Sequence, residues 1–239
     1  MGVQAELMIQ AAEQLKSEII AYRRALHQQP EVGAYLPNTK EFVKKALSEM
    51  GYAPVEICES GIVATITGKN TGSCILLRAD MDALAIKEQT DLPFRSENGK
   101  MHACGHDMHT SMLLGAARLL KTYQSELKGT VKLVFQPDEE GFTGAKAMLD
   151  AGILKSPAPQ AGLALHVHSG TRSGLVLCGK GSIMAGCTLF RISVQGTGCH
   201  ARCRRRELTP SILPPISILP LQEITAREIT AKSPAVVTV

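Results

Sequence analysis

The chain has 239 residues and a formal net charge of +4, and 44% of its residues are hydrophobic. This length allows one large domain or two smaller ones, and the apolar content is ordinary for a globular protein. Much of the positive charge comes from one arginine run at residues 202–206, so we expect no nucleic-acid partner. No stretch reaches the length needed to span a membrane, and we expect no membrane partner either.

The cysteines are odd in number and scattered, and no basic, apolar leader sequence precedes them. This pattern favours reduced thiols over a disulfide framework. We therefore expect a cytoplasmic protein. The seven cysteines are Cys58, Cys74, Cys104, Cys178, Cys187, Cys199 and Cys203.

Helical periodicity dominates the start of the chain. Apolar residues recur at helical spacing over residues 5–28, which predicts a helix that ends at the PEVG sequence of residues 30–33. A second amphipathic helix is expected from Asn38, which we predict to be its N-cap. Residues 61–68 alternate in polarity and predict a strand, and residues 73–84 predict a buried strand that ends in acidic residues.

The middle of the chain alternates between helix and strand patterns. After a loop at 87–103, the sequence predicts a helix at 107–123, a strand at 129–137, a short helix at 144–152 and a strand at 162–170. This alternation predicts an α/β fold with helices on the faces of a sheet. From about residue 176, short glycine-punctuated strands suggest that a second domain begins.

Side chains suited to acid–base chemistry or metal binding gather where the predicted strands end. Because sites in open α/β sheets lie beyond the carboxyl ends of the strands, we expect these side chains to meet at one edge. They are Asp80 and Asp82 after one strand, Glu139 and Glu140 after another, His166 and His168 at the end of a third, and the CGHD sequence of residues 104–107.

Cys104 and His106 lie in the sequence HACGHDMHT, and in an extended segment their side chains would point the same way. Thiolate and imidazole suit a borderline-soft divalent ion, and carboxylates also accept harder ions. A single pair of this kind is a weak signal. Its combination with Glu139, Glu140 and His166 is much stronger.

Five motifs between about residues 20 and 200 resemble the M20 metallopeptidases, especially the amidohydrolase branch with its hippurate hydrolases, N-acyl-amino-acid deacylases and auxin-conjugate hydrolases. The resemblance implies a zinc-peptidase-like catalytic domain, with a mixed sheet flanked by helices, in residues 1–180. It also implies the start of an inserted α+β lid and dimerisation domain in residues 181–239. The motifs are LHQQPEVG, LLRADMDALAIKEQTDLPFRSENGKMHACGHDMHT, VFQPDEEG, LALHVHSG and VQGTGCHA.

The same resemblance implies an enzyme that hydrolyses the amide bond of hippurate-like N-acyl amino acids with metal-activated water. Its two divalent ions could be Mn²⁺, Zn²⁺, Ni²⁺ or Co²⁺, and a homodimer would form through the lid. The implied metal ligands are Cys104, His106, Glu140 and His166.

Three further residues receive roles from the resemblance. Glu139 matches the general base that takes a proton from the attacking water. Asp80 matches an acidic residue that orients a ligand. His200 matches a lid histidine that reaches the partner subunit's site and helps to bind the developing oxyanion.

Structural roles are the alternative for several neighbouring residues. We expect His102 and His109 to be helix-start or packing residues, and His27 to be a structural signature of the family. His168 could replace His166 as a ligand, although the family pattern places the ligand first.

The acidic neighbours are also expected to be structural. Asp107 suits the first turn of a helix, where the helix dipole favours a negative charge. Asp138 stands where the family more often has a small residue, and we expect it to be a solvated loop carboxylate.

The chain departs from the family after His200. The family pattern continues as GAMP and GVDPINIAAHI, whereas this chain reads ARCRRRELTPSILPPISILPL over residues 201–221. We wrote the family pattern as codons, choosing among synonymous ones, and translated it one base late. This translation reproduces residues 201–204 and 207–217 of the chain, which indicates a frameshift. The adjacent prolines of this segment should break the expected amphipathic helix. Loss of the apolar face of that helix should weaken dimerisation through the lid.

Members of the family continue beyond the position of Val239 and supply a last metal-binding histidine there. We therefore expect a C-terminal catalytic segment to be missing and the second metal site to be incomplete. The alternatives to an active enzyme are an inactive remnant that binds metal or a small ligand, and a fragment that needs a separate C-terminal piece.

Overall fold

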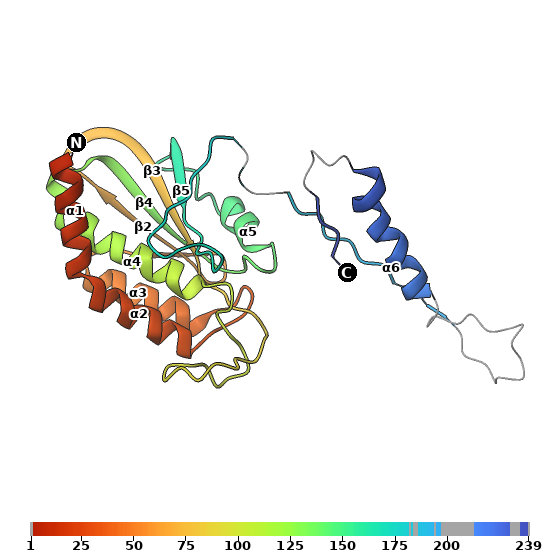
Figure 1. Ribbon diagram of the computed structural model, residues 1–239. Helices are drawn as coiled ribbons and strands as arrows, with labels where there is room; N and C mark the ends of the chain where they lie inside the picture. The colour runs from red at the N-terminus through yellow and green to blue at the C-terminus, as the bar shows by residue number, and fades with distance from the viewer. Residues whose placement is uncertain are drawn as a thin grey trace, which may run out of the picture. The chain divides into compact units, whose positions relative to one another are not determined.

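The computed structural model describes residues 2–181, 183, 186–193, 195–196, 213–229 and 235–238 (Figure 1). It divides into two units, Met1–Thr171 and Arg172–Val239. The assignment of residues 181–239 to the start of a lid domain stays a prediction. His200 and residues 201–212 of the proposed frameshift lie outside the described residues.

The first unit contains a mixed five-stranded sheet with the strand order β1-β2-β4-β3-β5. β3 runs parallel to β4 and β5, whereas β2 is antiparallel to β1 and β4. The mixed sheet with flanking helices confirms the predicted fold class. Its strands are β1 (Val55–Ile57), β2 (Gly61–Thr67), β3 (Asn70–Asp80), β4 (Lys128–Gln136) and β5 (Ala161–Ala164).

Helices cover both faces of this sheet (Figure 1). The predicted helix over residues 5–28 is interrupted at Leu15, whose N–H bonds to Ala12 in a tighter turn. Residues 87–103 form the predicted loop. The helices are α1 (Gly2–Gln14), α2 (Lys16–Gln28), α3 (Pro37–Glu49), α4 (His106–Thr122), the 3₁₀ turn η1 (Gln124–Glu126) and α5 (Gly144–Asp150).

The main core lies between the sheet and helices α3 and α4. Alternate side chains of the strands, such as Ile62 of β2 and Phe135 of β4, point to this face because side chains alternate along a strand. They pack against Leu47 of α3 and Leu114 of α4, all fully buried. Burial on this scale fixes the register of the strands, since a shift of one residue would expose the apolar set.

Asn38 is not the N-cap of α3, as the sequence predicted. The helix begins at Pro37, a residue favoured at the first helical position because its missing N–H would be unpaired there anyway. The carboxylate of Glu31 accepts the backbone N–H groups of Asn38 and Thr39 at 3.2 and 2.8 Å. The cap therefore comes from the preceding turn.

The second unit contains α6 (Leu213–Glu223) and the π-helical turn η3 (Ile224–Glu228). α6 begins at Leu213, so Pro214 and Pro215 lie in its first turn, where backbone N–H groups have no helical acceptor. The residues before 213 lie outside the described ones, and the expected break of the helix stays a prediction. Only Pro220 lies in the interior.

Composition led us to expect reduced cysteines and no membrane-spanning segment. The cysteines of the described residues, Cys58, Cys74, Cys104, Cys178 and Cys187, are all unpaired. Among the described residues, no helix combines the length and apolar character needed to cross a membrane.

Candidate metal centre

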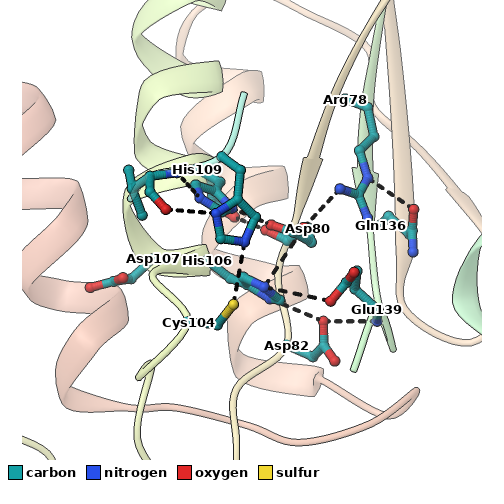
Figure 2. Close-up of polar contacts among 12 residues, drawn as sticks. Arg78, Asp80, Asp82, Cys104, His106, Asp107, His109, Gln136 and Glu139 are labelled. Carbon is teal, nitrogen blue, oxygen red and sulfur yellow. Dashed lines mark hydrogen bonds and ion pairs between the residues drawn. The ribbon is translucent and has the colours of Figure 1, made fainter. Parts of the chain in front are cut away.

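The site lies at the edge of the sheet where the parallel strands β3, β4 and β5 end. In the strand register, Asp80 of β3 is paired with Gln136 of β4, and Ala164 of β5 is paired with Arg78. The residues that follow these three strands therefore lie close together, beside the start of α4 (Figure 2). The strand predicted over 162–170 is shorter in the structure and begins one residue earlier, because only Ala161–Ala164 pair with β3.

Three sets of potential ligand atoms among the described residues share His106, and two of them consist of predicted ligands and the predicted base. One set is Cys104, His106 and His166, and the other is His106, Glu139 and Glu140; within each set the atoms lie within 4.8 Å of one another. The Sγ of Cys104 is 3.3 Å from Nε2 of His166. Nε2 of His106 is 3.7 Å from Glu139 and 3.9 Å from Glu140. The structure thus brings together the four predicted ligands and the predicted base.

His106 is fully buried, yet neither of its ring nitrogens has a hydrogen-bond partner among the described residues. The buried Oε1 of Glu140 also lacks one. Buried polar atoms are normally paired, because leaving them unpaired costs about 1–3 kcal/mol each. An imidazole nitrogen and a carboxylate oxygen are both ligands of divalent ions. The unpaired atoms therefore fit a metal site.

The electrostatics of the cluster also suit a cation. Burial and the nearby carboxylates, first that of Glu140, raise the pKa of the Cys104 thiol to about 12. Burial alone would lower the pKa of His106, but Asp82, Asp80 and Glu139 raise it. A bound divalent cation would reverse the effect on the thiol, because a coordinating thiol loses its proton.

Asp80 does not hydrogen-bond to a predicted ligand. Its carboxylate accepts hydrogen bonds from Nδ1 of His109 at 2.6 Å and from Arg78 at 2.8 Å. Burial opposes ionisation, but these two partners, with His106 nearby, lower the pKa of Asp80 to about 2. Any orienting effect of Asp80 therefore passes through His109.

His109 holds the segment after β5. Its Nε2 accepts the backbone N–H of Val167 at 2.9 Å, while Nδ1 donates to Asp80. A ring used in this way keeps no lone pair for an ion, although His109 lies within 4.8 Å of Asp80 and His106. These contacts agree with the packing role expected for His109.

Asp82 was expected at this edge of the sheet, but the sequence reasoning gave it no role of its own. Its carboxylate accepts the backbone N–H groups of Glu139 at 3.0 Å and Glu140 at 3.1 Å. Its Oδ1 also lies 3.4 Å from Nδ1 of His106. Asp82 thereby fixes the backbone that presents both glutamates. The sequence feature that points to Asp82 is its position two residues after Asp80, among the acidic residues that end this strand.

Asp138 and His168 are two neighbours of the predicted site residues for which the sequence suggested other roles. Asp138 is buried, 8% exposed, and accepts the hydroxyl of Thr143, so its prediction as a solvated carboxylate was wrong. It lies at a positive φ of 51° in the turn before Glu139. His168 is exposed and contacts Thr171 at 2.9 Å, outside both ligand sets.

Gly105 allows the start of α4 to approach the segment after β5. Its φ is 92°, and a Cβ added there would lie 2.4 Å from Cγ2 of Val167, next to His166. We expect Gly105→Ala to lower the free energy of unfolding by at least about 2 kcal/mol and to weaken metal binding, because strain and overpacking add.

Gly99→Ala is the matched control, because Gly99 also has a positive φ (79°) but nothing within 4 Å of an added Cβ. It should cost only about 1 kcal/mol. Urea unfolding of both variants measures the difference. Equal losses would show that the contact with Val167 has no effect.

Comparison with known proteins adds sequence relatives to this geometry. Residues 76–237 match the family model described as Peptidase family M20/M25/M40. IAA-amino acid hydrolase ILR1-like 5 from Arabidopsis thaliana is 41% identical over 225 residues, covering 92% of this chain and 51% of the relative. N-acetyl-L-cysteine deacetylase from Bacillus subtilis is 40% identical over 228 residues, covering 94% of this chain and 54% of the relative.

A solved structure is also similar. The Bacillus subtilis YxeP protein, described as a dinuclear metal binding peptidase from the M20 family, matches with a TM-score of 0.61 and 40% identity. The match covers 64% of this chain and 44% of that one. The chain spans about half the length of the curated relatives that it matches. The match to the family model covers more than half of the residues of this chain. The chain therefore belongs to Peptidase family M20/M25/M40.

Proposed function

We propose that this protein is a metal-dependent amidohydrolase that cleaves the amide bond of N-acyl amino acids. The observation that carries the proposal is His106, a fully buried histidine with two unpaired ring nitrogens, shared by two sets of ligand atoms. Cys104 and His166 would complete one metal site, and Glu140 would belong to the other. The two ions could be Mn²⁺, Zn²⁺, Ni²⁺ or Co²⁺, since all suit mixed sulfur, nitrogen and oxygen ligands.

Divalent ions in such a site lower the pKa of water and polarise the scissile carbonyl. Glu139 is the group we assign as general base. Its side chain is 36% exposed, so water can reach it, and its Oε2 faces the imidazole of His106. Asp82 fixes its backbone. His200, by resemblance to the family, would donate to the developing oxyanion from the lid of a partner subunit.

The names of the relatives guide the choice of substrate. They include hydrolases of IAA-amino acid conjugates, an N-acetyl-L-cysteine deacetylase and an N-acyl-L-amino acid amidohydrolase. We propose substrates of this class, with hippurate as a simple representative. A homodimer formed through residues 181–239 and a cytoplasmic location belong to the same proposal.

Metal binding without turnover is the second candidate function. It is favoured by one observation: both sets of predicted site residues lie within residues 104–166 and include buried ligand atoms of His106 and Glu140 that are unpaired among the described residues. These residues could bind an ion whether or not hydrolysis follows.

The test is hydrolysis of hippurate, N-acetyl-L-cysteine and an indole-acetyl amino acid with added Mn²⁺, by the wild type and Glu139→Gln. We expect turnover by the wild type and a loss of about 10²–10⁴-fold in the variant, because a general base contributes about that much. Metal binding should fall much less than turnover, because Glu139 is assigned as the base and not as a required ligand. Wild-type binding without turnover would favour the second candidate, and absence of binding would contradict both.

A further inference from the structure

His27 is a buried histidine whose ring lies between two carboxylates. Its Nδ1 is 2.8 Å from Oδ2 of Asp107, and its Nε2 is 3.1 Å from Oε1 of Glu88. His27 is 2% exposed, and its ring packs edge-on against Phe94 with the ring centroids 5.6 Å apart. Because an ionised carboxylate only accepts hydrogen bonds, the ring donates at both nitrogens. His27 is therefore a fixed double donor from the end of α2.

The first partner, Asp107, belongs to the first turn of α4, directly after His106. Figure 2 shows that its side chain points away from the ligand cluster. Arg23 of α2 donates to the same oxygen at 2.9 Å. No side chain caps this helix start, where Gly105 is the N-cap. The two bonds from α2 therefore fix the rotation of the turn that carries His106.

The second partner, Glu88, organises the loop that leads to Cys104. Its carboxylate accepts the hydroxyl of Thr90 at 2.5 Å and the backbone N–H of Ser96 at 2.7 Å. In the sequence, Cys104 and His106 stand between Glu88 and Asp107. One imidazole ring thus holds both ends of the segment that contains these two ligands.

We propose that His27 is a positioning residue that holds Cys104 and His106 in the arrangement required for metal binding. The inference rests on the metal centre proposed above. Charges balance within the network, because His27 and Arg23 face Asp107 and Glu88. Removing one donor would leave a buried carboxylate underpaired, and the first turn of α4 could then rotate.

Two variants of similar shape each keep one of the two hydrogen bonds of His27 and remove the other. The amide nitrogen of His27→Asn can reach the position of Nδ1 and keep the bond to Asp107. The amide nitrogen of His27→Gln can reach the position of Nε2 and keep the bond to Glu88. Tyr22→Phe is the control, because it removes a hydrogen bond to Glu18 on the same helix α2, away from the ligands.

The experiment titrates Co²⁺ into the full chain and follows the thiolate-to-cobalt charge-transfer absorption, with thermal unfolding of the metal-free proteins recorded in parallel. We expect His27→Gln to weaken Co²⁺ binding by about tenfold, the lower end of the effect of outer-shell partners, and His27→Asn to weaken it less. Tyr22→Phe should lower only the unfolding temperature.

Wild-type affinity and absorption in folded His27→Gln would overturn the inference, because a purely structural role changes only unfolding. If His27→Gln does not fold, Arg23→Gln decides, since it removes the other donor to Asp107 from a partly exposed side chain. It should weaken binding in the same direction, and unchanged affinity would overturn the inference. Failure of the wild type to bind Co²⁺ would instead overturn the proposed metal centre itself.

Discussion

His106→Ala is expected to abolish the binding of divalent metal at both ligand sets. The reason is that His106 is common to the set with Cys104 and His166 and to the set with Glu139 and Glu140. Its loss should weaken binding by more than about 100-fold, beyond the usual effect of losing an outer-shell partner. Equilibrium dialysis with Mn²⁺ or Zn²⁺, followed by metal analysis, measures the number of ions bound.

His168→Ala is the matched control for this prediction. His168 is also a histidine after β5, but it is exposed and lies outside both sets. Its replacement should leave stoichiometry and affinity unchanged. Metal binding that survives in His106→Ala would contradict the role of His106, and loss of binding in His168→Ala would reverse the choice made between His166 and His168.

Lys132→Met is expected to cause the largest loss of stability outside the metal centre. Lys132 is 3% exposed on β4, and its Nζ donates to the carbonyls of Ile153, Lys155 and Pro157 at 2.7–2.8 Å. All three donors of the ammonium are used. Methionine has a similar length but no donor, so we expect the free energy of unfolding to fall by about 3 kcal/mol.

Lys132→Met should also affect the candidate metal centre. The carbonyls bound by Lys132 belong to the connection between α5 and β5, and β5 leads directly to His166. Metal affinity should therefore fall as well. Lys128→Met, at the exposed start of the same strand, should change stability by less than about 0.5 kcal/mol. Identical urea midpoints for the two variants would contradict the role of Lys132.

Periodicity and strand-end chemistry were sufficient to predict the elements around the site. The strands that became β2, β3 and β4 have alternating or buried apolar patterns, and the core selects their register. Because parallel strands end at one edge of the sheet, topology predicts that the candidate site residues lie near one another. These residues are Cys104, His106, Glu139 and His166. The individual contacts between their side chains cannot be predicted from the sequence pattern.

Other features depend on tertiary contacts that a linear pattern does not contain. β1 has only three residues and exists through its pairing with β2. Asp138 looks like a loop carboxylate, yet Thr143 and the surrounding turn bury it. Lys132 reads as a polar strand position, and only the carbonyls from residues 153–157 show why a lysine is buried there.

The same limit applies to Asp82 and His27. Asp82 is indistinguishable from Asp80 by residue type, and its partners are backbone N–H groups 57 and 58 residues away. His27 meets Asp107 across 80 residues. Such roles arise from folding, whereas the ligand types and the strand ends can be read from the sequence.

X-ray absorption at the zinc edge of the Zn²⁺-loaded chain tests the proposed centre most directly. The account predicts one sulfur neighbour, from Cys104, at about 2.3 Å, together with nitrogen and oxygen neighbours at about 2.0–2.2 Å. The sulfur contribution should disappear in Cys104→Ser. A spectrum with no sulfur neighbour in the wild type, or one unchanged in Cys104→Ser, would contradict the assignment of the metal centre.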